Sequence, residues 1–357
     1  MVLTLEFFDA KHGDAFLTRW GDGGDRAMLV DGGPTGLWEG SLRAALLPRL
    51  PRSGVGAPTL DAVMLSHVDD DHAAGLVRLL AEIRRARRDH KPDPISVRRL
   101  WFNAVEELVD RVDPDLSASV QPLLDDAHHD EAVAASYNQG REIRDAAEVL
   151  GLQGNQPFEA PLVCGAVTDL AGLAVTVVAP DQAALDALAT KWRQAKKAKD
   201  PGVLAASYTD RSIPNLSSIV VHVEHGGRTA LLTGDARGDR LLTGLEQSGL
   251  VAKGGGLHVD VFKLPHHGSI NNMEPDLFER VTADHYVISA DGVRHHHPNE
   301  ETLEALVGAR GSADKYTIHL TNEIPFAATK LADLQDGRAF ATRTRAAAEP
   351  VIRVELS

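Results

Sequence analysis

Five side chains that commonly bind metal ions lie within six residues of one another. They follow a short apolar run and are His67, Asp69, Asp70, Asp71 and His72. Carboxylates crowded in this way repel one another unless a positive charge lies among them. Imidazole and carboxylate are both good ligands for zinc, manganese or iron. The stretch therefore predicts a site for a divalent cation.

Strands that end at one edge of a sheet would bring further ligands to this site. The run Ala62–Leu65 predicts a buried strand, and a helical pattern follows from Ala73. Four other predicted strands also end in polar groups, which are Asp31, Asp235, His266 with His267, and His297. Functional sites collect where strands give way to loops at one edge of a layered α/β fold. We therefore expect these groups to converge.

Composition narrows the class of protein. The chain has 357 residues, enough for one large domain or two ordinary ones, and a net charge of −14. An acidic chain is not a general nucleic-acid binder, although a nuclease is not excluded, because metal-binding carboxylates themselves add negative charge. Cys164 is the only cysteine, so no intramolecular disulfide and no cysteine-based metal site is expected. No run of eighteen apolar residues and no signal-peptide pattern is present, so we expect a cytoplasmic protein.

A second histidine pair could be interpreted as another metal site. His128 and His129 lie among acidic residues in a polar, helical stretch at 104–150. No strand fixes the geometry there, so a solvated helix or loop is the favoured interpretation.

The ligand stretch resembles the metal-binding signature of the metallo-β-lactamase fold. That signature is usually His-x-His-x-Asp-His, and here it reads His-x-Asp-x-Asp-His over residues 67–72. Residues 231–235 (Leu-Leu-Thr-Gly-Asp) and 263–269 (Lys-Leu-Pro-His-His-Gly-Ser) resemble later motifs of the same fold. The resemblance implies a four-layer αββα sandwich of the α/β class. The catalytic domain would span residues 1–310, with a helical insertion at about 104–160, and residues 311–357 would be a C-terminal extension packed on it.

One branch of this fold matches more of the sequence. Asp69 replaces the usual second histidine, as in the metallo-β-lactamase-like domain of competence DNA-uptake channel proteins. Residues 8–15, residues 29–33 and the pair His297-Pro298 are also similar to that branch. Those channel proteins carry membrane segments, and none is expected here.

The resemblance implies two divalent metal ions. His67 and Asp69 would bind one ion, Asp71, His72 and His266 would bind the other, and Asp235 would bridge both. The family usually supplies a further histidine about twenty residues before the bridging aspartate. Residues 213–218 contain none, so Asn215, a serine, water or substrate would complete the first site. This oxygen-rich set shifts the preference from zinc towards manganese or magnesium.

The resemblance also implies a mechanism. Water between two cations about 3.5–4 Å apart becomes a hydroxide nucleophile. Asp71 would orient it, and His267 or His297 would stabilise the developing charge or protonate the leaving group.

Three further residues have predicted roles around these ligands. Asp14 and Asp31 are interpreted as acceptors that fix the ligand imidazoles, or equally as turn residues beside glycine. Lys263 is a weak candidate for contact with phosphate.

The favoured hypothesis for function is a metal-dependent phosphodiesterase, a nuclease acting on DNA, with a role in bacterial antiviral defence as a further implication. A hydrolase of small esters, thioesters or lactones is the alternative, and a catalytically silent binding or regulatory module is another. A partner protein could bind the insertion or the C-terminal extension.

Overall fold

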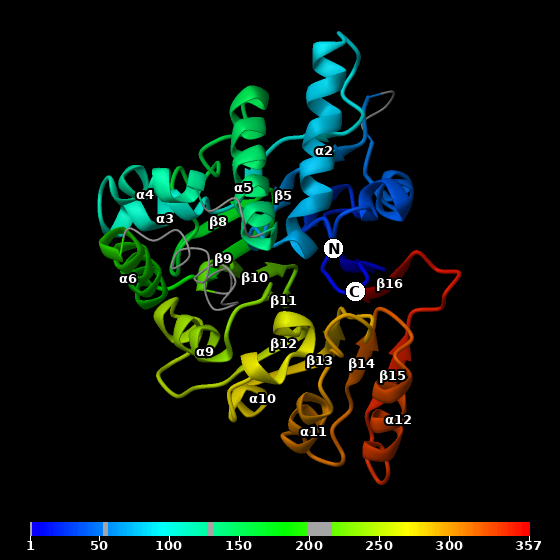
Figure 1. The fold of residues 1–357 in the computed structure, drawn as a ribbon. Helices are drawn as coiled ribbons and strands as arrows, with labels where there is room; N and C mark the ends of the chain where they lie inside the picture. Colours follow the sequence, from blue (N-terminus) through cyan, green and yellow to red (C-terminus); the bar gives the residue numbers. More distant parts are fainter. Residues whose placement is uncertain (1, 53–55, 127–130, 199–215) are drawn as a thin grey trace.

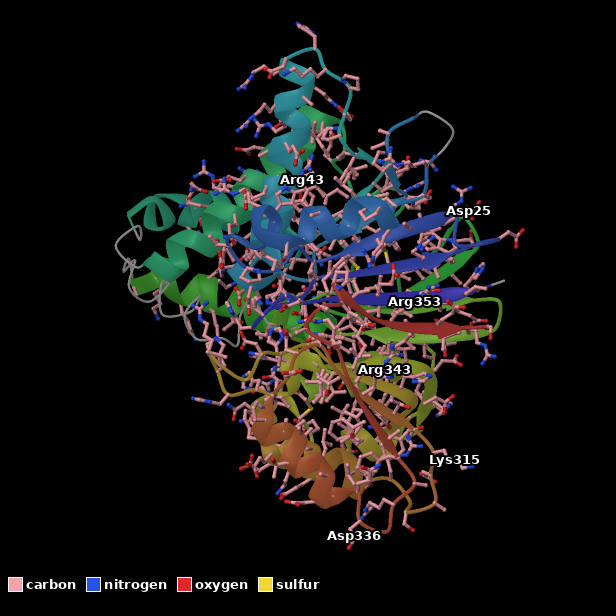
Figure 2. The ribbon with its side chains drawn as sticks, turned by 90° about the vertical axis from the view of Figure 1, so that its right-hand side faces the viewer. Asp25, Arg43, Lys315, Asp336, Arg343 and Arg353 are labelled. Atoms are coloured by element: carbon pink, nitrogen blue, oxygen red, sulfur yellow. The ribbon has the colours of Figure 1, made fainter. Side chains whose placement is uncertain are left out.

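Two β-sheets lie face to face with helices against the outer face of each (Figure 1). The computed structural model describes residues 2–52, 56–126, 131–198 and 216–357. Three clusters of buried apolar side chains lie between successive layers: one between the sheets and one beneath each set of helices. The layers are also visible in the perpendicular view of Figure 2. The predicted four-layer αββα architecture is therefore confirmed.

The first sheet places two strand ends beside each other. Its order is β16-β1-β2-β3-β5-β7. Its strands are β1 (Leu3–Phe8), β2 (Phe16–Trp20), β3 (Arg26–Val30), β5 (Ala62–Met64), β7 (Leu100–Trp101) and β16 (Val351–Leu356). Because β3 and β5 are parallel, with Val30 opposite Met64, the loops that follow them leave the same edge.

The second sheet aligns three further strand ends. Its order is β15-β14-β13-β12-β11-β10-β9-β8. Its strands are β8 (Val167–Leu170), β9 (Leu173–Ala179), β10 (Val220–His225), β11 (Arg228–Leu232), β12 (Leu257–Lys263), β13 (Val281–Ile288), β14 (Thr317–Leu320) and β15 (Ala341–Thr344). Strands β11 to β15 are mutually parallel, so the loops after β11, β12 and β13 leave one edge. A small separate sheet pairs β4 (Thr59–Leu60) with β6 (Ser96–Val97).

Helices cover the outer faces of both sheets. Against the first sheet pack η1 (Trp38–Leu42), α1 (Arg43–Leu46), η2 (Leu47–Arg49), α2 (Asp70–Arg88), α3 (Val105–Val112), α4 (Leu116–Asp126), α5 (Glu131–Leu150) and α6 (Gln182–Ala198). Against the second pack α9 (Gly238–Gln247), α10 (Leu277–Arg280), α11 (Glu300–Gly308) and α12 (Pro325–Leu334). Short turns η3 (Pro265–Gly268) and η4 (Ile270–Asn272) follow β12. No helix in the described ranges is long and apolar enough to cross a membrane.

Helix α2 shows how the sequence pattern directs this packing. Leu76, Leu79, Leu80 and Ile83 recur at helical spacing and are buried against the first sheet. Their stripe fixes the axis of α2, and with it the position of the helix N-terminus at the sheet edge.

The expected insertion and extension both form regular structure. The stretch 104–160 contains α3, α4 and α5, and α5 packs along α2. Residues 311–357 supply β14, α12, β15 and β16. Strand β16 pairs with β1, so this C-terminal stretch contributes strands to both sheets.

Candidate metal centre

The loop from β5 to α2 carries the first group of candidate ligands. Helix α2 begins at Asp70, three residues before the predicted start at Ala73. Acidic side chains suit the partial positive charge of a helix N-terminus, which explains why Asp70 and Asp71 belong to the first turn. Asp69 precedes the helix with an extended backbone, and its carboxylate does not cap the helix. Instead its Oδ2 lies 3.6 Å from Nε2 of His67.

Close backbone contacts hold the start of α2 in place. The amide of Gly32 donates to the carbonyl oxygen of His72 (2.7 Å), and the amide of Asp14 donates to that of Asp71 (3.1 Å). A Cβ atom at Gly75 would lie 1.9 Å from the carbonyl oxygen of Gly32, so only glycine permits this approach. The loops after β1 and β3 therefore fix the ligands at the helix N-terminus.

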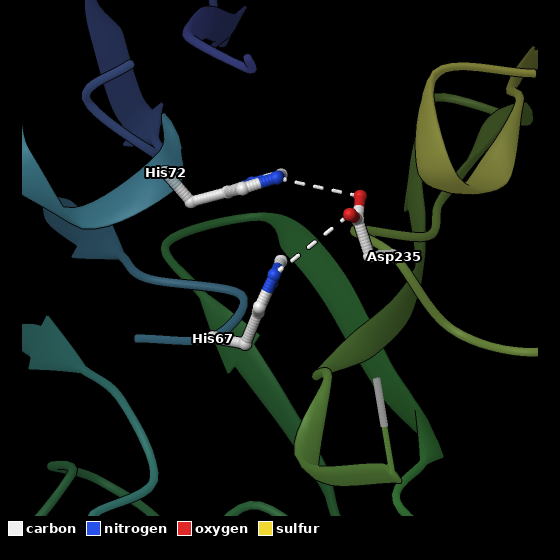
Figure 3. Close-up of side chains that lie close together, drawn as sticks. All are labelled: His67, His72 and Asp235. Carbon is white, nitrogen blue, oxygen red and sulfur yellow. Dashed lines mark ion pairs between the residues drawn. The ribbon is translucent and has the colours of Figure 1, made fainter. Parts of the chain in front are cut away.

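Asp235, in the loop after β11, faces imidazoles with both of its oxygens (Figure 3). Its Oδ1 lies 3.3 Å from Nε2 of His72 and 3.7 Å from Nε2 of His267. Its Oδ2 lies 3.9 Å from Nε2 of His67 and 3.6 Å from Nε2 of His266. The two oxygens thus lie nearest two different pairs of imidazoles, as expected of a bridging carboxylate, although ligand atoms of His67, His72 and Asp235 also lie within 4.8 Å of one another.

One further carboxylate belongs to each group. Asp69 lies beside His67, and Oδ2 of Asp71 lies 3.5 Å from Nε2 of His267. These separations are too long for good hydrogen bonds. Two atoms that each lie about 2.1 Å from a tetrahedral ion are about 3.4 Å apart, so the spacing suits atoms that share a cation.

The imidazoles of His67 and His72 are oriented through their other ring nitrogens. Nδ1 of His72 lies 2.8 Å from Oδ2 of Asp31, and Nδ1 of His67 lies 3.1 Å from Oγ of Ser66. That hydroxyl donates to the same Asp31 oxygen (2.8 Å). A proton held on Nδ1 leaves the Nε2 lone pair directed at the centre, as in metal-binding histidines. Asp31 therefore has the orienting role that the sequence analysis considered for it.

His266 and His267 are neighbours in sequence, but their side chains reach different sides of Asp235. Both have positive φ angles, 46° and 55°, which are uncommon for residues other than glycine and cost about 1–3 kcal/mol each. Their ring planes cross at 86°. Nδ1 of His267 donates to the carbonyl oxygen of Ser289 (2.9 Å), which directs its Nε2 towards Asp71.

This geometry exchanges the expected roles of the two histidines. The sequence analysis placed His266 with Asp71 and His72 and reserved His267 for catalysis. The structure instead brings His267 together with Asp71 and His72, and turns His266 towards the other oxygen of Asp235. The left-handed backbone is the physical reason, because it swings consecutive side chains apart.

Buried polar atoms without hydrogen-bond partners test whether a cation fits. Nε2 of His67, His72 and His267 and Oδ1 of Asp235 are all buried and have no such partner among the described residues. Each atom left this way costs about 1–3 kcal/mol, so natural proteins seldom keep one without a reason. Four of them converging on one place are explained by a divalent cation, and the residues present fit it.

The pKa shifts agree with a site built for positive charge. Burial lowers the pKa of His267, but the carboxylates of Asp235 and Asp14 raise it more, to about 10. Burial likewise lowers the pKa of His72, yet Asp235 and Asp31 raise it well above its ordinary value. Without a cation, these imidazoles hold protons that balance the carboxylates. A metal ion would take the place of those protons.

His297 lies next to the centre and is neutral. Its side chain is buried, and its ring centroid is 5.7 Å from that of His266. Within the part of the chain that the structure describes, neither of its ring nitrogens has a hydrogen-bond partner. Burial, with the neighbouring His266 and His267, lowers its pKa to about 3. At neutral pH it can donate a hydrogen bond to substrate but carries no extra proton. This favours charge stabilisation over protonation of a leaving group.

Lys263 does not face substrate. It is fully buried, pairs with Asp14 and donates to the carbonyl oxygen of Gly234 (3.1 Å). The prediction of a phosphate contact is therefore wrong, since no solvent path reaches the amine. The pair holds Asp14 close to Nδ1 of His267, at 3.6 Å.

Asn215, which was considered for completing the first site, lies outside the described residues, as does the pair His128 and His129, for which a solvated helix or loop was the favoured interpretation. Of the serines considered for the first site, Ser218 accepts a hydrogen bond at Oγ from the amide of Asp235 (3.3 Å). Sequence reasoning missed Ser66 and Ser289, because a serine or a carbonyl group that orients an imidazole has no distinctive pattern.

Comparison with known proteins identifies the domain. Residues 10–121 match the family model of the metallo-beta-lactamase superfamily. No curated protein sequence matches the chain. Zn²⁺-bound PqqB from Methylobacterium extorquens is 14% identical, with a TM-score of 0.40 and coverage of 96% of this chain and 87% of that one. A variant of the β-hydroxylase CmlA is 12% identical, with a TM-score of 0.41 and coverage of 99% and 53%.

A candidate metal-dependent hydrolase from Parabacteroides distasonis is 11% identical, with a TM-score of 0.37 and coverage of 85% and 88%. The segment matched by the family model includes the loop from β5 to α2. The chain therefore has the metallo-β-lactamase fold, with a segment that matches the superfamily model and a His/Asp cluster that could hold a metal ion.

Proposed function

We propose that this protein is a two-metal hydrolase of phosphodiesters, and that DNA is its substrate. The single observation that carries the two-metal assignment is Asp235, whose two oxygens face two different groups of imidazoles. In this proposal His67, Asp69 and His266 hold one ion, and Asp71, His72 and His267 hold the other. This set differs from the predicted one, in which His266 rather than His267 was grouped with Asp71 and His72.

The proposed chemistry suits a phosphodiester because the metal ions are positively charged and the phosphodiester is negatively charged. When bound, two divalent cations acidify water to form a nucleophile and neutralise charge on the substrate oxygens. Asp71 lies with His72 and His267, with Oδ2 3.5 Å from Nε2 of His267, and its second oxygen would orient the water. His297 donates a hydrogen bond to the developing charge. Three carboxylates among the ligands support manganese or magnesium beside zinc.

The test uses the purified chain with plasmid and single-stranded DNA, in the presence of manganese or zinc. We expect cleavage that depends on metal and is lost in Asp235→Ala and His72→Ala. His258→Ala is the matched control, because His258 is exposed on β12 and lies outside every described cluster. If the wild type leaves DNA intact but opens a chromogenic ester or lactone, the phosphodiester proposal is wrong and the small-ester hydrolase replaces it.

The remaining proposals concern context. A partner protein at the helical insertion or at residues 311–357 stays a prediction, because these segments leave room for one. A role in antiviral defence stays a prediction that follows from the resemblance of the sequence.

A further inference from the structure

A buried arginine in the C-terminal stretch contacts two segments that both lead to His267. Arg345 directly follows β15 and is only 7% exposed. Its Nε donates to the carbonyl oxygen of Thr321 (2.7 Å), and its Nη1 donates to two carbonyl oxygens of its own loop (3.1 and 2.6 Å). Its Nη2 donates to Oδ1 of Asn322 (3.0 Å) and pairs with Oδ2 of Asp9 (2.9 Å). A guanidinium has five N–H donors, so these five acceptors engage all of them. The arginine therefore holds parts of the chain together rather than binding a ligand.

The first segment, Thr321 and Asn322 after β14, holds the backbone next to Ser289. The amide of Ala290 donates to Oγ1 of Thr321 (3.2 Å), and Nδ2 of Asn322 donates to the carbonyl oxygen of Ala290 (3.0 Å). The preceding residue, Ser289, accepts the Nδ1 proton of His267 at its carbonyl oxygen (2.9 Å). Because Ala290 is bound at both its amide and its carbonyl group, this segment fixes the acceptor that directs His267.

The second segment is the loop after β1, which begins at Asp9. The carbonyl oxygen of Gly13 in this loop accepts a hydrogen bond from Oγ of Ser289 (2.8 Å). The next residue, Asp14, has Oδ1 at 3.6 Å from Nδ1 of His267. The two segments that the arginine joins therefore reach the same imidazole from two sides.

We propose that Arg345 is a positioning residue of the metal centre, which fixes the orientation of the His267 imidazole through Asn322 and Asp9. The inference rests on the assignment of His267 to a metal ion in the proposed function, but not on the nature of the substrate. A ligand that is not held in advance loses conformational freedom when it binds metal, and this lowers the affinity. The C-terminal stretch thus supports a metal ligand in addition to supplying strands to both sheets.

The test measures the affinity of the full chain for Co²⁺, because the visible absorption of this ion reports its ligands. Arg345→Met removes all five donors. Its affinity for Co²⁺ should fall about tenfold, which is the lower end of the range for groups that orient metal ligands, and its absorption spectrum should change. Arg345→Lys keeps the charge but not the fork of donors and should give an intermediate value. Asn322→Ala and Asp9→Ala each remove one of the two connections and should each give a smaller loss.

Arg310→Met is the matched control, because the side chain of Arg310 is as buried as that of Arg345, at 9% and 7% exposed. Arg310 donates to the carbonyl oxygen of Ala283 (2.9 Å) and to the hydroxyl group of Tyr286 (2.7 Å). These contacts lie on β13 itself, whereas Ala290 follows the end of that strand. Urea unfolding of the metal-free proteins should show a loss of stability in both variants. Only Arg345→Met should change the affinity and the spectrum of the folded protein.

The outcomes separate this inference from the proposed function. Equal affinity for Co²⁺ in the wild type and Arg345→Met, or an equal loss in Arg345→Met and Arg310→Met, would overturn the inference. If Arg345→Met does not fold, Asn322→Ala decides, and unchanged affinity in that variant would overturn it. No substrate enters the measurement, so a failure to cleave DNA would remove the phosphodiesterase and leave the positioning role standing. A wild type that binds no Co²⁺ would remove the metal assignment and this inference with it.

Discussion

Two groups of histidines, one at the metal centre and one on β13 and β14, differ in what surrounds them. His285 on β13 and His319 on β14 form a pair, with Nδ1 of one 3.1 Å from Nε2 of the other. Burial lowers the pKa of both, and that of His319 falls to about 3. At the metal centre, burial acts in the same direction on His72 and His267, but carboxylates outweigh it.

The comparison shows that burial alone does not make a cation site. On β13 and β14, Nδ1 of His285 faces Nε2 of His319, and burial is the largest cause of both lowered pKa values. At the metal centre, carboxylates outweigh burial at His72 and His267 and raise their pKa, whereas burial still lowers the pKa of His266. The sign of the pKa shift therefore distinguishes His72 and His267 from the structural pair, but not every ligand of the centre.

The largest effect is expected for Asp235→Ala, which removes the oxygens shared by both groups. Metal bound after dialysis should fall sharply, and hydrolysis should fall about 10³-fold or more, equivalent to about 4 kcal/mol of transition-state stabilisation. Metal content by plasma mass spectrometry and activity together check this. His319→Ala is the control and should retain its metal. Full metal content in Asp235→Ala would contradict the assignment of Asp235 as a bridge.

The next effect concerns the stability provided by the buried ion pair between Lys263 and Asp14. Lys263→Met leaves Asp14 buried without its cation and should lower the free energy of unfolding by about 3–5 kcal/mol. Urea unfolding of the metal-free protein measures this. The double variant Lys263→Met, Asp14→Asn should recover most of the loss. If the double variant is no more stable than the single one, the pair is not the source of the effect.

A smaller effect is expected for the acceptor that orients His72. Asp31→Ala removes the partner of Nδ1 but no ligand, so metal affinity should fall about 10–100-fold. Titration with manganese or zinc checks the value. Asp70→Ala is the matched control, because Asp70 bonds only to Thr35 and Gln139 among its described partners. Equal losses in both variants would argue against a specific role for Asp31.

Counted per pH unit, the smallest effect is a pair of opposite pH trends in the metal-free protein. His267 has a raised pKa of about 10, so its contribution to stability is complete below about pH 6.5 and is lost as pH rises towards 10. His319 has a lowered pKa of about 3, so stability falls as pH drops below about 6.5.

Each trend has a slope of up to about 1.4 kcal/mol per pH unit. Urea unfolding across pH should show His267→Gln flattening the alkaline side and His319→Gln flattening the acidic side. Identical profiles for wild type and both variants would break the contrast between the two groups.

Most of the fold could be predicted from strand ends and apolar periodicity. The runs before Asp31, His67 and Asp235 are short, apolar and followed by polar loops, which places them in parallel strands with a common edge. The strand β15, whose residues are mostly exposed, and the helix α12 lacked a strong pattern and were missed. Their positions depend on the neighbouring strand and on tertiary packing rather than on local sequence.

The sequence predicted which residues are candidate ligands, but it did not fully predict which of them lie together. His67, Asp71, His72 and Asp235 carry a recognisable spacing, and they do converge. The partners of His266 and His267 depend on their two positive φ angles. No sequence pattern predicts a positive φ angle for histidine. The burial of Lys263 also escaped prediction, because its partner Asp14 lies almost the whole domain away in sequence.

The pairing of β1 with β16 constrains the order in which the fold can form. Leu3 lies opposite Leu356, and Phe8 lies opposite Val351, so this edge joins the two ends of the described chain (Figure 1). Contacts so distant in sequence carry a high loop-closure cost and slow folding. During synthesis the ligand-bearing loops after β5, β11 and β12 emerge before β16 does. The first sheet therefore keeps an open edge at β1 until the final residues of β16 arrive.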